Sequence, residues 1–192
     1  MGYFFLLRRS EYLADKGRAK PNILRYTDVV CLTKDGNQAQ VEEKASSVRV
    51  KFRGSKTDQS GHGETRIRER SGLWWACPVR ASWLLLTHQR QKNIPSDEPL
   101  CSVTPGKIIT ATDMTRAVKQ AAQAAGEEPD RYGTHSMRSG GATALFTAGI
   151  DRLAIKRFGR WKSDAYERYT RIDGQVLSGL AANLISSNHL RP

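Results

Sequence analysis

The stretch Gly133–Tyr169, GTHSMRSGGATALFTAGIDRLAIKRFGRWKSDAYERY, decides the fold predicted for this chain. It sets His135 and Arg138 three residues apart at the start of a helix rich in small apolar residues, with the tripeptide GRW at 159–161 further on. Residues three apart on a helix share a face, so His135 and Arg138 are predicted to project together. A guanidinium beside an imidazole suits a phosphate group, because arginine offers a planar fork of charged donors and histidine exchanges a proton near neutral pH.

The wider pattern predicts an α+β fold, mostly helical with a small antiparallel β-sheet. Strands are expected at 23–32, 47–54 and 64–70, and the last two form a hairpin that carries Lys56 near its turn. Helices are expected at 3–14, from Pro78 to 91, at 113–125, from 135 to Gly149, at 151–158, and from Ser163 or Asp164 through Tyr169. Thr112 and Thr134 are predicted caps, and Gly126 is a predicted helix end.

The charge, the cysteine count and the apolar content of the chain limit the functions and partners that it can have. Lysine and arginine number 31 against 19 acids, a net charge of +12 at a length of 192 residues, which favours one compact domain with a polyanionic partner. Three widely spaced cysteines without a C-x-x-C pair indicate neither a disulfide framework nor a zinc site. The apolar run at 3–7 is too short to cross a membrane, so no membrane association is expected. A reducing compartment, cytoplasm or nucleus, fits this composition.

The motifs HSMRSGG at 135–141, GRWKSDAYERYTR at 159–171 and RRSE at 8–11 resemble the tyrosine recombinases of the phage-integrase family. The sequence of these motifs is most similar to that of recombinases from tyrosine-recombinase retrotransposons and related mobile elements. The resemblance implies a catalytic domain over residues 1–172, truncated at its N-terminus and without the core-binding domain. It also implies a tail helix at 173–192 for exchange between protomers, double-stranded DNA as the partner, and a synaptic complex, a tetramer on DNA.

The resemblance also implies a catalytic set. Tyr169 attacks the scissile phosphate and forms a 3′-phosphotyrosine link, which stores the bond energy without ATP. Arg8 and Arg138 clamp the nonbridging oxygens, so the reaction needs no metal or other cofactor. Lys56 protonates the leaving 5′-oxygen, and His135 assists proton movement or hydrogen-bonds the phosphate.

Two positions in the implied set stay open. The family donor, usually His or Trp, directly follows the glycine and precedes the nucleophile by nine residues, which selects Arg160 by spacing and Trp161 by residue type. Tyr166 lies one helical turn before Tyr169 and is the alternative nucleophile. Spacing from Gly159 and the following Thr-Arg pair favour Tyr169.

Two further features have a functional and a purely structural interpretation. Basic residues alternate along the hairpin and either track the DNA backbone or form a solvated strand face; they are Arg49, Lys51, Arg53, Arg66 and Arg68. The small residues of HSMRSGGATA predict a helix that packs closely on a neighbour. Glu11 is a candidate support for Arg8 from the following turn.

The predicted function is therefore site-specific recombination or integration of DNA by strand transfer. One alternative is a catalytically inactive DNA-binding remnant that keeps the fold and the charge. Another is a type IB topoisomerase-like enzyme, which shares the chemistry but relaxes supercoils.

Overall fold

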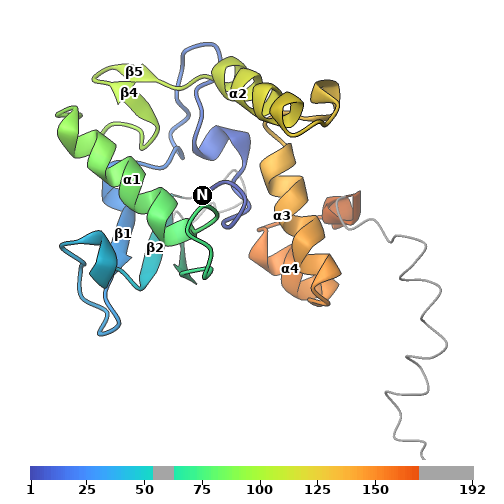
Figure 1. Cartoon of the computed structure of the whole chain (residues 1–192), viewed down its shortest axis with the longest axis horizontal. Helices are drawn as coiled ribbons and strands as arrows, with labels where there is room; N and C mark the ends of the chain where they lie inside the picture. The colour runs from blue at the N-terminus through green and yellow to red at the C-terminus, as the bar shows by residue number, and fades with distance from the viewer. Residues whose placement is uncertain (54–62, 169–192) are drawn as a thin grey trace, which may run out of the picture. The chain divides into compact units, whose positions relative to one another are not determined.

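A computed structural model describes residues 1–53 and 63–168 (Figure 1). The chain divides into two compact units, Met1–Gly141 and Ala142–Pro192, and the boundary falls within one helix. The described residues combine α-helices with small antiparallel sheets, which confirms the α+β class.

The first unit contains a three-stranded antiparallel sheet in the order β1 (Val29–Leu32), β2 (Ser47–Phe52) and β3 (Glu64–Glu69). Successive side chains of a strand point to opposite faces. Val48 and Val50 of β2 are accordingly buried, whereas Arg49 between them is exposed. The predicted pairing of β2 with β3 is confirmed; the turn between them, with Lys56, lies outside the described residues.

β1 is shorter than the strand predicted at 23–32. Tyr26–Asp28 instead form a 3₁₀ turn, and the carboxylate of Asp28 accepts the backbone N–H of Arg25 at 2.8 Å. Such a local bond from a side chain to the backbone competes with strand pairing. The strand therefore begins only at Val29.

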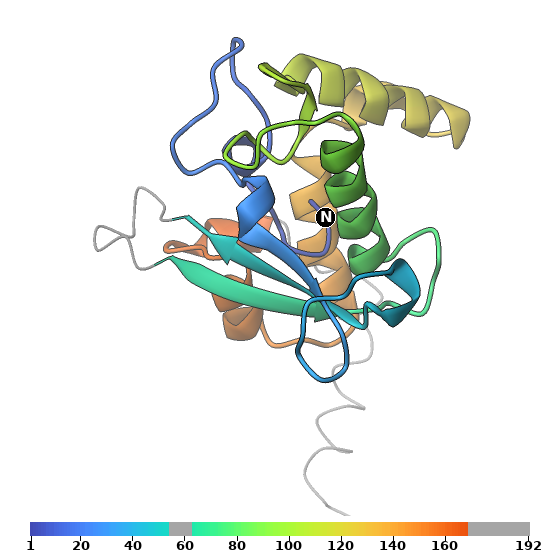
Figure 2. The same ribbon diagram turned by 90° about the vertical axis from the view of Figure 1, so that its left-hand side faces the viewer.

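The helix α1 (Pro78–Gln91) begins at the predicted proline and packs on all three strands (Figure 2). Its Gln89, 1% exposed, donates from Nε2 to the carbonyls of Pro99 at 2.9 Å and Leu100 at 2.8 Å. This glutamine ties the helix to the loop that leads into the small two-stranded sheet of β4 (Ser102–Thr104) and β5 (Lys107–Ile108).

The helix α2 (Ala111–Ala124) starts two residues earlier than predicted, and Thr112 is not its cap. Thr110 is extended, and its hydroxyl accepts the N–H of Asp113 at 3.1 Å while the Asp113 carboxylate accepts the N–H of Thr110 at 3.2 Å. This reciprocal pair satisfies two helix-end donors, which makes Thr110 the N-cap of α2. Gly126, with φ of 76°, ends the helix as predicted.

The segment at 3–14 is not the predicted helix but a series of turns followed by a three-residue 3₁₀ turn, Arg9–Glu11. Three successive residues, Phe5, Leu6 and Leu7, are buried at 2%, 1% and 3% exposure. A helix with a single apolar face would not bury three consecutive side chains. Leu6 also has a φ of 46°, which a right-handed helix excludes.

The predicted helices that start near 135 and 151 are present. The helix α3 (Ser136–Thr147) is followed by Gly149, with φ of 79°, and α4 (Arg152–Phe158) is capped by Asp151. The Asp151 carboxylate accepts two backbone N–H groups at 2.9 and 3.0 Å. Where a helix was predicted from Ser163 or Asp164 onward, the described residues form a 3₁₀ turn, Asp164–Arg168, and Tyr169 lies outside the described residues.

The loop between β3 and α1 presents apolar side chains to solvent. Leu73, Trp74 and Trp75 are 52%, 75% and 71% exposed. The hydroxyl of Ser71 fixes the loop, because it accepts the N–H of Leu73 at 3.2 Å and donates to the carbonyl of Ala76 at 2.6 Å. Across residues 1–53 and 63–168, the helices are too short or too polar to span a membrane.

Candidate functional site

The first arginine of the predicted set is fixed by a buried carboxylate. Glu11 is 4% exposed, and its Oε2 accepts the backbone N–H of Arg8 at 2.7 Å while Oε1 accepts from Arg8 Nη1 at 3.1 Å. A buried carboxylate is stable only when paired and hydrogen-bonded, and Arg8 supplies both. About a third of the Arg8 side chain, 32%, remains exposed. Glu11 therefore holds Arg8 in one place at the surface.

The second arginine reaches the same N-terminal segment. Arg138 on α3 is 5% exposed and donates from Nη1 to the carbonyl of Leu6, two residues before Arg8. Arg8 lies within residues 6–11 and Arg138 is hydrogen-bonded to them. The structure thus brings both predicted phosphate clamps to one segment, although the two arginines are distant in sequence. A guanidinium held by a backbone carbonyl keeps its full charge in a fixed position.

The close approach of α3 to this segment depends on a glycine. A Cβ placed on Gly141 would lie 2.5 Å from Leu6 Cδ2 and 2.5 Å from the carbonyl oxygen of Tyr3. Gly140, the preceding residue, faces only the Tyr3 ring at 3.8 Å. The structural interpretation of the small-residue motif is therefore confirmed at Gly141, and the same packing brings Arg138 to Leu6.

His135 does not share the environment of Arg138. It precedes the first residue of α3, Ser136, and its side chain is exposed while that of Arg138 is buried. The hydroxyl of Ser136 accepts the N–H of Gly133 at 2.9 Å, and this bond closes the turn ahead of the helix. The structure thus places an exposed imidazole at the helix start and a buried guanidinium three residues later, and the common face stays a prediction.

A tyrosine that the sequence pattern did not single out joins the two motifs. Tyr12 follows Glu11 directly, is 6% exposed, and donates its hydroxyl to the carbonyl of Thr134 at 3.4 Å. Thr134 immediately precedes His135. A tyrosine inside a buried apolar run needs a hydrogen-bond partner, and this was the available signal in the sequence.

The five basic residues of the hairpin divide by face. Arg49 and Lys51 are exposed on the outer face of β2. The other three, Arg53, Arg66 and Arg68, make contacts within the protein.

Each of those three contacts is specific. Arg53 Nε lies 2.6 Å from the carboxylate of the buried Asp28, and Arg66 pairs with Glu64. Arg68 donates from Nε to the carbonyl of Phe4 at 3.3 Å, and burial lowers the pKa of its guanidinium. Arg49 and Lys51 therefore have the geometry expected of residues that track a phosphate backbone, and DNA contact by all five stays a prediction.

In the second unit, Trp161 folds back on the glycine before Arg160. A Cβ on Gly159 would lie 1.5 Å from Trp161 Cζ3, so a side chain there would displace the indole. Arg160 adopts the left-handed conformation, with φ of 59°, which makes this turn possible. Both Arg160 and Trp161 are half-buried, and the choice between them as phosphate donor stays open.

Tyr166 is packed as a structural aromatic side chain. It is 6% exposed, and its ring centroid lies 6.2 Å from that of Trp161. Lys156 Nζ lies 5.9 Å from the centroid of the Tyr166 ring. A pairing of Lys156 with Asp164 at 2.7 Å holds the lysine there. Tyr169, like Lys56, lies outside the described residues, so their predicted roles stay predictions.

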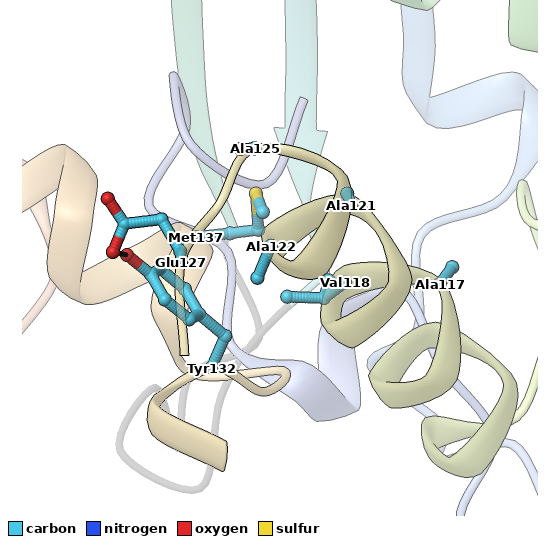
Figure 3. A pocket seen from close by; sticks show the side chains of 8 residues that line it. All are labelled: Ala117, Val118, Ala121, Ala122, Ala125, Glu127, Tyr132 and Met137. Atoms are coloured by element: carbon cyan, nitrogen blue, oxygen red, sulfur yellow. Dashed lines mark hydrogen bonds between the residues drawn. The ribbon is translucent and has the colours of Figure 1, made fainter. Parts of the chain in front are cut away.

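A groove on α2 differs in character from the arginine site. It has a volume of about 420 Å³ and is lined mainly by alanines of α2 together with Val118, Tyr132 and Met137 (Figure 3). Glu127 contributes the charged group of this lining, which does not suit a phosphate. Within the part of the chain that the structure describes, no three His, Cys, Asp or Glu side chains are grouped to hold a metal ion.

The fold is similar to that of solved structures of a site-specific DNA recombinase. Two such structures, of the XerH site-specific recombinase, are a post-cleavage complex on palindromic difH substrate, with a TM-score of 0.62, and a pre-cleavage complex on difH substrate, with a TM-score of 0.58. Each is 15% identical over 94% of this chain, and the chain spans 42% and 44% of the two XerH chains. No protein-family profile and no curated protein matches the sequence.

Proposed function

We propose that the chain is the catalytic domain of a tyrosine recombinase, a DNA strand transferase that cuts and rejoins DNA through a 3′-phosphotyrosine intermediate. One observation carries the proposal. In a fold similar to that of XerH, Arg8 is held by Glu11 and Arg138 is held by Leu6, so both arginines are fixed to the same segment, residues 6–11. Two fixed guanidinium groups suit the two nonbridging oxygens of one phosphodiester.

The proposed reaction exchanges one phosphodiester for another. The phenolic oxygen of Tyr169 attacks the scissile phosphorus and the bond from phosphorus to the 5′-oxygen breaks, which leaves a 3′-phosphotyrosine and a free 5′-hydroxyl. Lys56 donates the proton that the leaving oxygen takes up, and His135 accepts the phenolic proton or hydrogen-bonds the phosphate. Attack by a 5′-hydroxyl in the reverse direction then rejoins the strand.

The packing of Tyr166 supports Tyr169 as the nucleophile. A phenol that is 6% exposed between Trp161 and Lys156 would have to leave this packing to reach a phosphate. Tyr169 follows three residues later in the sequence, and its neighbours Thr170 and Arg171 match the motif that carries the resemblance. Tyr166 then has the role of supporting the segment that bears the nucleophile.

The biological setting belongs to the same proposal. The amino-acid sequence of the motifs favours the recombinase of a mobile element, which integrates or excises that element. Double-stranded DNA is the substrate, and several protomers act in a synaptic complex, with residues 173–192 of one protomer docked on the next. The excess of 31 basic over 19 acidic residues supports the DNA partner.

The direct test is a covalent capture assay. A nicked duplex from the ends of the DNA element that encodes the chain is incubated with the protein, and adducts are resolved on denaturing gels for wild type, Tyr169→Phe and Tyr166→Phe. We expect an adduct that is lost in Tyr169→Phe and kept in Tyr166→Phe. Substitution of Arg8, Arg138 or Lys56 should slow adduct formation about a hundredfold or more.

The alternatives are separate outcomes of the same assay. Adduct loss only in Tyr166→Phe would identify Tyr166, three residues earlier in the sequence, as the nucleophile. DNA binding without any adduct would identify an inactive DNA-binding remnant. Relaxation of supercoiled plasmid without joining of two sites would identify a type IB topoisomerase-like activity.

A further inference from the structure

Residues 6–12, here called the arginine turn, are joined at two points to α3 and to the residue pair that precedes it, Thr134 and His135. At one end of the turn, Arg138 donates to the carbonyl of Leu6. At the other end, the hydroxyl of Tyr12 donates to the carbonyl of Thr134, across 122 positions in the sequence. Arg8 and Glu11 lie between these two attachments, and His135 is the residue after Thr134.

The hydroxyl of Tyr12 is placed to act as a fixed donor. Tyr12 is 6% exposed, and burial raises the pKa of its phenol to about 12, so the proton stays on the oxygen at neutral pH. The donor and acceptor are 3.4 Å apart, within reach of a hydrogen bond in a site that excludes most water. Tyr12 therefore constrains the peptide that leads into the exposed His135.

We propose that Tyr12 is a positioning residue for His135, which holds the Thr134 carbonyl and so fixes the histidine relative to the arginine turn. The inference rests on the proposed function for its catalytic meaning, since His135 serves the scissile phosphate only in that reaction. The Tyr12 hydroxyl touches no reacting atom. It acts by limiting the orientations that the 134–135 peptide samples, which orients the imidazole before DNA binds.

The sharpest variant is Tyr12→Phe, because it removes the hydroxyl and keeps the buried ring. Its matched control is Tyr132→Phe, which removes a tyrosine hydroxyl from the same first unit, here one that donates to the exposed Glu127 at 3.0 Å. Both variants are made in the full chain, and a far-ultraviolet spectrum and a thermal melt verify folding. The chain has four histidines, so the His135 signal is assigned with His135→Asn.

The decisive readout is the imidazole of His135 followed by NMR from pH 5 to 9 without DNA. In Tyr12→Phe we expect a changed titration midpoint or a broadened His135 signal, while Tyr132→Phe matches wild type. A purely structural role of the ring would leave both variants alike, since the ring remains. His135 signals in Tyr12→Phe that superimpose on those of wild type would overturn the proposal.

A second readout connects the inference to chemistry. The rate of adduct formation on the nicked duplex should fall about fivefold or more in Tyr12→Phe, with the dissociation constant for DNA within twofold of wild type. An unchanged rate beside a changed His135 titration would overturn the positioning role in catalysis. Absence of an adduct from wild type bears on the proposed function alone, and the titration still decides whether Tyr12 positions His135.

Discussion

At the scale of single residues, the buried carboxylate of Glu11 has the clearest consequence. Its two oxygens take both the backbone N–H and the Nη1 of Arg8, at 2.7 and 3.1 Å. A hydrogen bond to a charged group contributes about 1.5–3 kcal/mol, more than a bond between neutral partners. Glu11 therefore has a larger effect on Arg8 than an exposed ion pair would have.

We expect Glu11→Gln to lower the free energy of unfolding by about 1–2 kcal/mol and to slow adduct formation about tenfold, because the amide keeps the shape but not the charge. Urea unfolding and the covalent capture assay measure the two effects. Asp15→Asn is the control, since the pair of Asp15 with Arg9 at 3.5 Å is exposed and contributes little. Wild-type stability and rate in Glu11→Gln would show that Glu11 does not support Arg8.

Cys31 makes stability depend on pH in the alkaline range. It is 2% exposed, and burial raises the pKa of its thiol to about 11. Between pH 9 and 11 the unfolded chain loses this proton while the folded chain keeps it, so the folded state loses stability as pH rises. Below pH 9 both states keep the proton, and Cys31 adds no pH dependence.

From pH 8 to 10.5 we expect Cys31 to account for about 2 kcal/mol of the loss in unfolding free energy, taking 1.36 kcal/mol per pKa unit. Urea unfolding of wild type and Cys31→Ala under reducing conditions at the two pH values measures it. The variant starts from a lower stability because of the cavity, but its loss over this interval should be smaller. Equal losses in the two proteins would contradict the assignment.

At the scale of elements, the approach of α3 to residues 1–7 depends on Gly141. A methyl group there meets Leu6 Cδ2 and the Tyr3 carbonyl at 2.5 Å, and the carbonyl belongs to the backbone, which cannot turn aside. Overpacking of this kind costs about 1–3 kcal/mol. The same displacement would draw Arg138 away from the carbonyl of Leu6.

Gly141→Ala should therefore destabilise the protein by about 1–3 kcal/mol and slow adduct formation, whereas Gly140→Ala should be neutral or stabilise by up to about 1 kcal/mol. Gly140 is the matched control because it lies on the same helix and meets only the Tyr3 ring at 3.8 Å. Chemical denaturation of both variants measures the difference. Similar stabilities would mean that the helix moves freely to accept the methyl group.

Elements with local signals were predictable from the sequence, and those made by distant contacts were not. The alternation in β2 and β3 and the proline that opens α1 act over a few residues, and these elements were predicted correctly. The segment at 3–14 takes its turns from contacts with α3, and Arg138 meets Leu6 across 132 positions. Local periodicity contains no information on such a contact. Motif order predicted Arg8 and Arg138 as the phosphate clamps, which stays a prediction, but it did not indicate that the carbonyl of Leu6 anchors Arg138.

At the scale of the whole molecule, net charge and local geometry make different predictions about DNA. The net charge of +12 predicts salt-sensitive binding regardless of which residues are involved. The structure separates Arg49 and Lys51, exposed on the outer face of β2, from Arg53, which is paired with the buried Asp28. Residues that neutralise phosphates and residues that hold the fold should therefore respond to different measurements.

We expect Arg49→Gln and Lys51→Gln each to lower the slope of log affinity against log salt by roughly 0.9, because each releases about one counterion fewer. Arg53→Gln should leave the slope unchanged and lower stability instead, since Asp28 loses its partner at 2.6 Å. Fluorescence anisotropy with a labelled duplex at several salt concentrations measures the slopes. A slope equal to that of wild type in all three variants would leave the strand face without a role in DNA contact.

The exposed loop before α1 determines how this protein is best followed by spectroscopy. Of its four tryptophans, Trp74 and Trp75 are 75% and 71% exposed in the folded state. Indoles that already contact water change their emission little when the chain unfolds, so intrinsic fluorescence will under-report unfolding, and circular dichroism is the better monitor. The same two side chains make emission a sensitive reporter of anything that covers this loop, including a second protomer assembled on DNA.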